Sequence, residues 1–421
     1  MKKNTAPEEQ AGSLVRHARL KAPVLARLEL TYACRARCPG CPREVRSAVR
    51  DILPGSAWHA MIKKLAPYVG EVHLTGGEPV LHPDFQEITA SLEREKVPFM
   101  LYTSGLWEHP GKVLAALKKC TQLKGITFSV HGHNEGTHDF FTGIRSYEEM
   151  KASLEMAARS GLVFHTAGVM GDFAKHYGKD IVKSVFAMGS RSHTFQRYIG
   201  PIRNGISMYR DDLQVLLRFI GELAGRHLPV MLEGCIPSCF HAGGTHCLSG
   251  ITRCTLDPLG QIRPCSFSEH SFGSLVEKPL TALWRRKAMS AWAGEYPGPC
   301  APCAMRFLCL GGCRAVRERF QVRCDTLMEE PLAQGPVAPM ALPVTGHDLE
   351  SRPRALFKTR KESFGYALIH GGEVVPVLAG ARPLVASYGG EKSLAEIRAR
   401  FGEEGMAFTL FLARRGFIEL S

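Results

Sequence analysis

Short apolar runs alternate with amphipathic stretches over the first half of the chain. The apolar runs predict buried strands at residues 24–31, 71–75, 99–103, 125–130, 163–169 and 193–199. The stretches with apolar residues every three or four positions predict helices at residues 57–65, 83–96, 112–119, 147–160 and 178–186. Strands that alternate with helices indicate parallel βαβ units, so an α/β domain is expected over residues 23–234. Six such units favour a partial (β/α)6 barrel of the TIM type, and a doubly wound open sheet is the alternative.

The pattern changes after a helix predicted at residues 211–226 and a short strand predicted at 229–233. Residues 235–330 hold most of the cysteines and many Gly and Pro residues, and their periodicity is weak. Such a segment builds little apolar core, so bound metal is expected to order it. Residues 1–22 are predicted to be a flexible tail and residues 331–351 a Pro-rich linker.

Regular patterning returns over residues 352–421, which predict a small α+β domain with a winged-helix-like order of elements. Strands at 364–370 and 373–377 flank the turn Gly371-Gly372 and predict a hairpin. Two short helices are predicted at 393–401 and 406–415, followed by a closing strand at 417–420.

The chain carries 53 Lys and Arg residues against 40 Asp and Glu residues, a formal charge of +13. This charge favours acidic partners such as nucleic acid, an anionic peptide or a charged cofactor, and does not choose among them. The N-terminus lacks the apolar segment of a secretory signal, and no run of about 18 apolar residues predicts a membrane helix. We therefore expect a cytoplasmic protein without a membrane partner. Among its 14 cysteines, the clustered ones are expected to serve as metal ligands rather than in disulfides.

Three cysteines follow the first predicted strand in a C-x3-C-x2-C array, namely Cys34, Cys38 and Cys41. Three thiolates hold three irons of a 4Fe–4S cluster and leave the fourth iron open to chelate a small molecule. A structural zinc site would normally need a fourth protein ligand. His59 lies downstream, so zinc is the alternative.

This array resembles the signature of the radical S-adenosylmethionine superfamily, in which the cluster binds S-adenosylmethionine. The motif Thr75-Gly-Gly-Glu-Pro79 resembles the family's segment for the methionine moiety. The resemblance implies cofactor contacts at the ends of successive strands, from Gly76, Gly77, Glu78, Pro79, Ser104, Ser129 and Arg197. Arg197, at the end of the sixth predicted strand, is expected to pair with the cofactor's carboxylate, and a solvated surface arginine is the alternative. Gly40 departs from the family pattern, since the residue before the third cysteine is usually aromatic, and this puts the adenine-side contact in question.

The later cysteines resemble the family's iron–sulfur extension called SPASM. The resemblance implies a first auxiliary 4Fe–4S cluster on Cys247, Cys254, Cys265 and Cys313. It implies a second auxiliary cluster on Cys300, Cys303, Cys309 and Cys324, and therefore three clusters in all. An all-cysteine zinc site over residues 300–313 is the alternative. Cys235 or Cys239 is the alternative to Cys254 in the first set, but we expect neither to be a ligand. Cys120 is expected to be a partly buried thiol.

Residues 352–421 resemble the peptide-binding domain of the pyrroloquinoline quinone peptide chaperone, a RiPP recognition element. The matching features include Pro353-Arg-Ala355, the Gly-Gly hairpin and a helix that opens at Ser393. The resemblance implies that this domain binds the leader of a precursor peptide through a strand edge and a helix groove. A winged-helix nucleic-acid binder and a structural cap are the alternatives. The chain has no concentrated basic helix or aromatic platform, so nucleic acid is not the expected partner.

Together these resemblances imply a radical S-adenosylmethionine oxidoreductase that modifies a ribosomally made precursor peptide. Its 5′-deoxyadenosyl radical would abstract hydrogen, and loss of a further electron would permit a thioether or carbon–carbon crosslink or another oxidation. An electron donor such as flavodoxin or ferredoxin is expected. Action on a folded protein or small metabolite is one alternative, and a non-catalytic iron–sulfur protein that binds nucleic acid is another. No side-chain acid or base is identifiable from the sequence.

Overall fold

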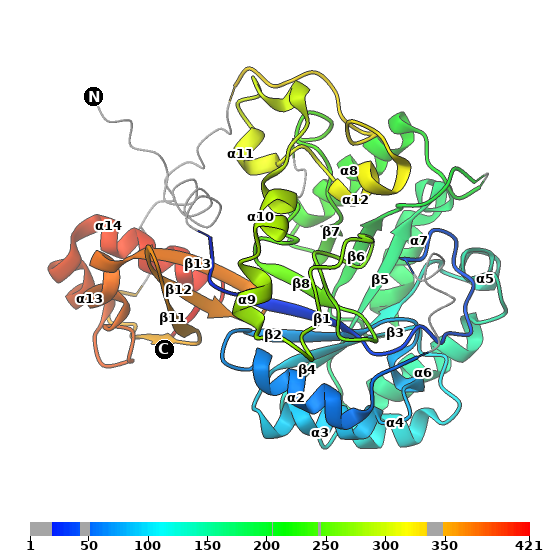
Figure 1. The fold of residues 1–421 in the computed structure, drawn as a ribbon, viewed down its shortest axis with the longest axis horizontal. Helices are drawn as coiled ribbons and strands as arrows, with labels where there is room; N and C mark the ends of the chain where they lie inside the picture. Colours follow the sequence, from blue (N-terminus) through cyan, green and yellow to red (C-terminus); the bar gives the residue numbers. More distant parts are fainter. Residues whose placement is uncertain (1–18, 43–50, 204, 243–245, 335–347) are drawn as a thin grey trace.

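A curved parallel sheet forms the centre of the molecule. The computed structural model describes residues 19–42, 51–203, 205–242, 246–334 and 348–421 (Figure 1). The sheet has nine strands in the order β7-β6-β5-β4-β3-β2-β1-β8-β9. Its strands are β1 (Leu25–Glu29), β2 (Glu71–Thr75), β3 (Phe99–Thr103), β4 (Leu123–Ser129), β5 (Phe164–Met170), β6 (His193–Arg197), β7 (Val230–Glu233), β8 (Arg253–Leu256) and β9 (Ile262–Arg263).

Neighbouring strands from β7 to β8 are all parallel, and β9 alone runs antiparallel, beside β8. Strands β1 to β7 follow one another in chain order across the sheet, which excludes the reversed order of a doubly wound sheet. The predicted partial barrel is therefore confirmed. Strand β8 comes from the cysteine-rich segment and extends the barrel sheet beyond β1.

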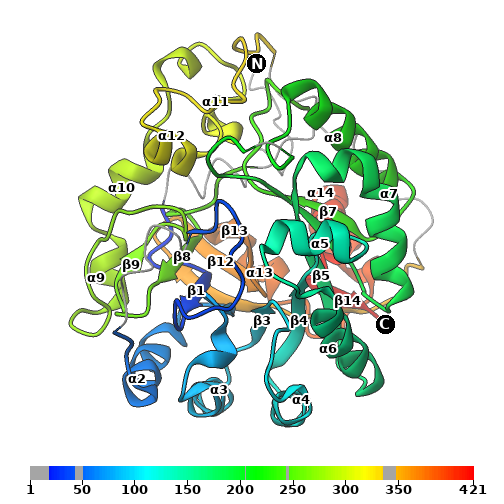
Figure 2. The same cartoon turned by 90° about the vertical axis from the view of Figure 1, so that its right-hand side faces the viewer.

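Helices cover the outer side of the curved sheet, as Figure 2 shows. They are α2 (Gly55–Leu65), α3 (Phe85–Arg94), α4 (Pro110–Leu117), α5 (Glu135–Thr142), α6 (Tyr147–Arg159), α7 (Asp172–Ala187) and α8 (Arg210–Gly225). Helix α2 shows why these helices pack on the sheet. Its apolar residues recur at helical spacing and are all buried, namely Trp58, Met61, Ile62 and Leu65. Helix α5 was not predicted, although Asn134 caps its first turn and Gly143 ends it in the left-handed conformation.

The cysteine-rich segment forms short helices and loops above one end of the barrel. Its elements after β9 are α9 (Leu280–Trp284), α10 (Lys287–Gly294), the 3-10 turn η3 (Gly298–Cys300), α11 (Arg306–Cys309) and α12 (Arg314–Phe320). These helices are short, as expected for a segment whose sequence shows weak periodicity. No helix among the described residues is long and apolar enough to cross a membrane.

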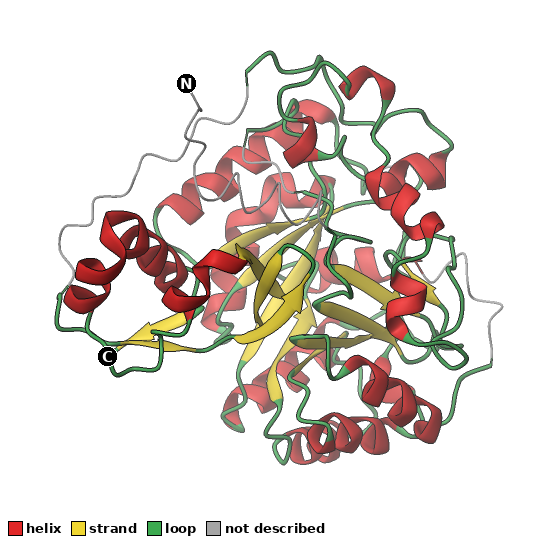
Figure 3. Ribbon diagram, turned by 60° about the vertical axis from the view of Figure 1, so that its left-hand side comes forward, coloured by secondary structure: helices red, strands yellow, loops and turns green. Residues whose placement is uncertain are grey.

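The C-terminal module contains two small antiparallel sheets and a helical layer, seen in Figure 3. Its strands are β10 (Pro353–Ala355), β11 (Lys358–Glu362), β12 (Gly365–His370), β13 (Glu373–Leu378) and β14 (Ile418–Leu420), and its helices are α13 (Arg382–Val385) and α14 (Leu394–Arg414). Helix α14 is broken at Gly402, where φ is 68°, so it corresponds to the two helices predicted there. Strand β11 was missed because its sequence, Lys-Thr-Arg-Lys-Glu, has no apolar alternation.

This module packs against the barrel at the start of β1 and β2. Ala367 and Ile369 on β12 form a buried cluster with Leu20 and Val24. Arg360 on β11 donates hydrogen bonds to the backbone oxygens of Ala22, Pro23 and Tyr68, at 2.7 to 3.0 Å. Residues 19–22, predicted as part of a flexible tail, are therefore ordered against the module, whereas residues 1–18 and 335–347, in the predicted tail and linker, lie outside the described residues.

Candidate active site and iron–sulfur ligands

The first cysteine array and the Gly-Gly-Glu-Pro motif are joined by backbone hydrogen bonds at the C-terminal ends of β1 and β2. Gly77 N–H donates to the Thr31 oxygen at 2.7 Å, and Glu78 N–H donates to the Ala33 oxygen at 2.8 Å. A Cβ on Gly76 would lie 2.4 Å from the Thr31 oxygen, and one on Gly77 would lie 2.3 Å from the Ala33 oxygen. Only glycine permits this approach. The motif therefore holds the segment that leads into Cys34, at the end of the strands where barrel active sites lie.

Glu78 links this motif to the end of β3. Its buried carboxylate accepts hydrogen bonds from the Thr103 hydroxyl at 2.8 Å, from Ser104 N–H at 2.8 Å and from the Ser104 hydroxyl at 2.6 Å. Burial raises the pKa of Glu78, while the bonds from Ser104 and Thr103 oppose that rise. Glu78 and Ser104, both predicted to contact the cofactor, thus lie side by side and bond to each other. Pro79 opens the 3-10 turn η2 (Pro79–Leu81).

Ser129, the other serine predicted to contact the cofactor, ends β4 and is half-buried. It lies in register with Ala167 of β5. Because β2, β3 and β4 are parallel neighbours, the ends that carry Glu78, Ser104 and Ser129 lie along the same edge of the sheet. The structure therefore brings these three predicted residues to one side of the barrel.

Gly40 has a structural explanation in this chain. Its φ is +70°, and a Cβ at this position would lie 2.8 Å from the ring of Tyr198 and 3.0 Å from the Cα of Gly200. Tyr198 and Gly200 follow strand β6. The space beside the third cysteine that an aromatic residue 40 would need is thus taken by a tyrosine from another part of the chain.

Arg197 does not match its predicted role. Its guanidinium forms two hydrogen bonds of 2.7 Å with the Asp325 carboxylate and donates to the Cys235 oxygen at 2.6 Å. Both side chains are almost completely buried. The prediction that Arg197 pairs with the cofactor's carboxylate is therefore corrected, because its charge is already balanced by Asp325 of the cysteine-rich segment.

Four cysteines gather for the first auxiliary site, and one of them differs from the prediction. The Cys235 thiol lies beside the thiols of Cys247 and Cys313, and its interaction with them raises its pKa. Cys265 lies near Cys247 and Cys313. Burial and the charges of those two thiols raise the pKa of the Cys265 thiol to about 12. Cys235, Cys265 and Cys313 also share one buried cluster.

Cys254, predicted as a ligand of this site, lies elsewhere. It belongs to β8, in register with Ala26 of β1, and is 1% exposed within the main apolar core. Burial raises the pKa of its thiol to about 12. The strand Arg253–Leu256 places this side chain in the barrel core, which a reading of cysteine spacing alone could not reveal. The β-branched residues Ile251, Thr252 and Thr255 around Cys254 were the available signal for a strand.

The second auxiliary site brings together the four predicted cysteines and one that was not predicted. Cys239, Cys300, Cys303 and Cys309 line one small cavity. Burial and the neighbouring thiols raise the pKa of the Cys300 thiol to about 11. Cys324 is one of these neighbours, so it lies close to Cys300. Cys239 Sγ accepts a hydrogen bond from Glu329 N–H at 3.2 Å. Five thiols therefore surround a site that needs four ligands.

These thiol groups suit iron–sulfur clusters by their chemistry. Thiolates are the ligands that such clusters take, and a cluster spreads its corner ligands more widely than a single ion does. In the part of the chain that the structure describes, no three His, Cys, Asp or Glu side chains are close enough together to hold one metal ion. Cys34, Cys38 and Cys41 are half-buried in the segment that follows β1.

Two family models match the chain. The Radical SAM superfamily model matches residues 28–183, and the iron-sulfur cluster-binding domain model, SPASM, matches residues 247–305. The chain is a radical S-adenosylmethionine enzyme with a SPASM domain. Residues 352–421 lie outside both matched regions.

Relatives of this radical S-adenosylmethionine enzyme span most of its length. A PqqA peptide cyclase of Methylobacterium sp. (strain 4-46) is 26% identical and covers 85% of this chain and 96% of its own. The mycofactocin maturase of Mycobacterium ulcerans is 25% identical over 71% of this chain and 85% of its own. An AdoMet-dependent heme synthase of Nitratidesulfovibrio vulgaris is 23% identical over 72% and 90%.

Solved structures support the same fold. SuiB of Streptococcus suis bound to S-adenosylmethionine superimposes with a TM-score of 0.63 at 15% sequence identity, over 76% of this chain and 79% of its own. SuiB bound to its precursor peptide SuiA gives the same TM-score of 0.63 at 16% identity. At this level of identity the similarity concerns the fold.

Proposed function

We propose that this radical S-adenosylmethionine enzyme modifies a ribosomally made precursor peptide. The observation that carries the proposal is the combination of both matched domains with relatives named as a PqqA peptide cyclase and a mycofactocin maturase. Each alignment covers most of both chains. When bound, the reduced cluster and S-adenosylmethionine supply a radical that abstracts hydrogen from the substrate. The modification is a crosslink, such as a thioether or carbon–carbon bond, or another oxidation.

The chain's own residues would hold these groups as follows. Cys34, Cys38 and Cys41 bind the radical-generating cluster, and the segment of Gly76, Gly77 and Glu78 lines the S-adenosylmethionine site with Ser104 and Ser129. Glu78 acts through its bonds to Ser104 and Thr103, which fix the ends of β2 and β3 relative to each other. Tyr198 supplies an aromatic ring beside Gly40.

Two auxiliary 4Fe–4S clusters complete the set of three. The first is bound by Cys235, Cys247, Cys265 and Cys313, since Cys235 lies beside the other thiols and Cys254 lies in the barrel core. The second is bound by Cys300, Cys303 and Cys309, with Cys324 or Cys239 as the fourth ligand. These clusters would accept the electron that an oxidative crosslink releases, and a flavodoxin or ferredoxin would be the donor for the first cluster. Fourteen thiols suit a reducing cytoplasm.

The C-terminal module would bind the leader of the precursor. It has the small three-stranded sheet and helices that the resemblance to a RiPP recognition element implies. The outer edge of β13 is limited as a site for strand addition, because Pro376 in its middle has no N–H to donate. Leader binding therefore needs contacts beyond this edge.

A second candidate substrate class is a small metabolite, and the similarity to an AdoMet-dependent heme synthase favours it. The C-terminal module would then be a structural cap on the barrel. Its extensive contacts with residues 19–24 and Tyr68 suit that role as well.

One experiment separates these classes. The anaerobically purified protein is reduced with dithionite and supplied with S-adenosylmethionine, and 5′-deoxyadenosine is quantified. The protein is also coexpressed with each short reading frame that neighbours its gene, and the peptides are examined by mass spectrometry. A peptide mass change that requires Cys34, Cys38 and Cys41 supports the proposal. Formation of 5′-deoxyadenosine without any peptide change favours a metabolite, and no 5′-deoxyadenosine at all contradicts both.

A further inference from the structure

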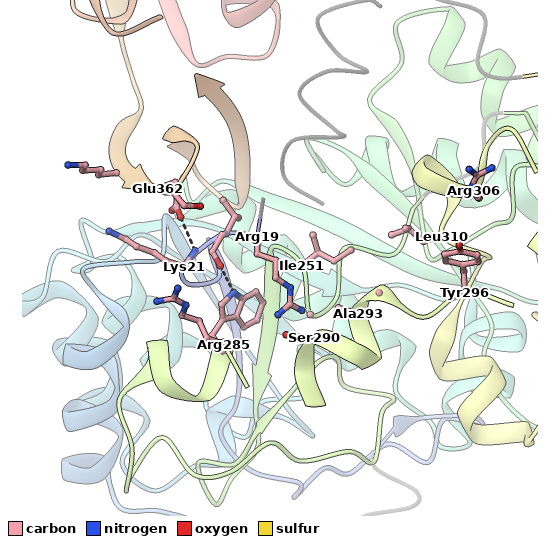
Figure 4. Close-up of a pocket in the computed structure, with 16 residues that line it drawn as sticks. Arg19, Lys21, Ile251, Arg285, Ser290, Ala293, Tyr296, Arg306, Leu310 and Glu362 are labelled. Atoms are coloured by element: carbon pink, nitrogen blue, oxygen red, sulfur yellow. Dashed lines mark hydrogen bonds between the residues drawn. The ribbon is translucent and has the colours of Figure 1, made fainter. Parts of the chain in front are cut away.

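A cavity of about 670 Å³ lies where three distant parts of the chain meet (Figure 4). One wall is the segment Arg19–Lys21, just before β1. A second wall comes from α9 and α10 of the cysteine-rich segment, and a third from the end of β11 and the following Ser363 in the C-terminal module. The volume falls within the range of about 300–1,000 Å³ that is typical of ligand sites.

The cavity is strongly cationic. Arg19, Lys21, Arg285 and Lys361 line it, and no ion pair found in the described ranges involves any of these four side chains. Desolvation by partial burial lowers the pKa of Arg19, as expected for a cation without an anionic neighbour.

The single acidic side chain in the lining does not offset this charge. Glu362 is fully buried and forms an ion pair of 2.6 Å with Arg360, which points to the barrel side. Its second oxygen accepts a hydrogen bond from Lys21 N–H at 2.8 Å, marked in Figure 4. Glu362 therefore anchors the N-terminal segment to β11, and Arg19, Lys21, Arg285 and Lys361 remain available to an external anion.

The cavity also has an apolar lining. Leu20, Ile251, Trp284 and Leu310 contribute to it, and the indole N–H of Trp284 is satisfied by the Leu20 oxygen at 3.0 Å. Tyr296 is 39% exposed at the far end. An occupant that fits this lining combines anionic groups with apolar groups, and a simple inorganic anion would use only the charged part of it.

We infer that this cavity binds an acidic, apolar segment of the substrate's leader peptide. The inference rests on the proposed peptide substrate and adds the place and chemistry of its recognition. Pro376 restricts strand addition at β13, whereas the cavity offers charge and apolar surface beside the same module. Its far end reaches Arg306, which also lines the small cavity of Cys300, Cys303 and Cys309. A leader bound here would be tied at once to the C-terminal module and to the cluster-binding segment.

The test uses the full-length, cluster-loaded protein and a fluorescein-labelled decapeptide of alternating Glu and Leu. Fluorescence anisotropy should show saturable binding that weakens as salt is raised, because exposed ion pairs are screened. A matched peptide with Gln in place of Glu should bind at least tenfold more weakly. The double substitution Arg285→Glu and Lys361→Glu should weaken binding of the Glu-Leu peptide at least tenfold.

Two further variants make the result specific. Lys112→Glu with Lys183→Glu gives the same change in net charge on exposed helices of the barrel and should leave binding and 5′-deoxyadenosine formation unchanged. Ser290→Trp adds bulk to the lining without changing charge and should also weaken binding, while iron content verifies that each variant is loaded.

The outcomes separate the inference from the proposed function. No saturable binding, equal loss in the Lys112 and Lys183 control, or full binding in both cavity variants would overturn the inference. If the cavity variants keep peptide binding but lose reduction by flavodoxin, the cations serve an electron donor and the inference is wrong. If the unaltered protein forms no 5′-deoxyadenosine, the proposed function itself fails, whatever the peptide does.

Discussion

The guanidinium of Arg197 and the carboxylate of Asp325 form a buried, two-pronged ion pair, with both N–O distances at 2.7 Å. Asp325 also accepts hydrogen bonds from the N–H groups of Cys313, at 2.6 Å, and Leu327, at 2.9 Å. The pair therefore joins the end of β6 to the loops that carry cysteines of both auxiliary sites.

We predict that breaking this pair destabilises the protein without changing the affinity for S-adenosylmethionine. Removal of one partner leaves a buried charge uncompensated, which costs about 3–5 kcal/mol. Arg197→Gln and Asp325→Asn should therefore lower the free energy of unfolding by similar amounts, as measured by denaturant titration. If Arg197 bound the cofactor's carboxylate instead, Arg197→Gln alone would raise the KM for S-adenosylmethionine.

Iron content should distinguish Cys235 from Cys254. Cys235→Ala removes a thiol that lies against Cys247 and Cys313, so the purified protein should lose up to about four irons, one cluster's worth. Cys254→Ala alters only a core packing position in β8 and should retain the full complement. Iron and sulfide analysis with Mössbauer spectroscopy measures both. Loss of a cluster in Cys254→Ala alone would restore the ligand set expected from cysteine spacing.

Arg360 should be essential for the attachment of the C-terminal module. Arg360→Leu leaves the oxygens of Ala22, Pro23 and Tyr68 without their donor and leaves Glu362 as an unpaired buried charge. The free energy that attaches the module to the barrel should fall by at least about 3 kcal/mol. Hydrogen exchange or limited proteolysis would then show early exposure of the module. Lys361→Ala, at the exposed neighbouring position, is the control and should show the protection of the unaltered protein. Equal protection in both variants would mean that apolar packing alone attaches the module.

Stability should fall at acidic pH partly through His193. Burial lowers the pKa of His193 to about 4, whereas the unfolded chain titrates near 6.5. The stabilising contribution of the neutral ring is therefore present above about pH 6.5 and is lost as pH falls toward 4. Between pH 7 and 5 this histidine accounts for a loss of about 2 kcal/mol.

The measurement compares the unaltered protein with His193→Asn, which keeps a polar atom for the Thr166 hydroxyl, now 2.9 Å from His193 Nδ1. The variant should show a flatter dependence of unfolding free energy on pH, and comparison of the two proteins cancels effects of acid on the clusters. Identical slopes from pH 7 to pH 5 would show that His193 does not titrate differently in the folded state.

Much of the barrel was predictable because its strands and helices carry their own periodicity. Glu71–Thr75 and Phe99–Thr103 have the predicted bounds, and the other predicted barrel strands differ by a few residues at their ends. The polar strand β11 was not predictable, since its Arg360 and Glu362 are buried only because each neutralises the other and bonds to distant backbone. Local sequence contains no trace of partners hundreds of residues away.

Local features of the sequence specify the chemistry of this protein. The spacing of Cys34, Cys38 and Cys41 and the cysteine-rich segment provide thiolate ligands, and the Gly-Gly-Glu-Pro motif permits a close backbone approach. Which cysteines lie together, and which charged side chains pair with each other, depends on the tertiary structure. Cys235 rather than Cys254 meets Cys247, because strand β8 pairs with β1 and carries Cys254 into the core. Arg197 meets Asp325 because the loop that carries Asp325 packs against the end of β6. Distances across a fold depend on how elements pack, and spacing along the chain does not encode them.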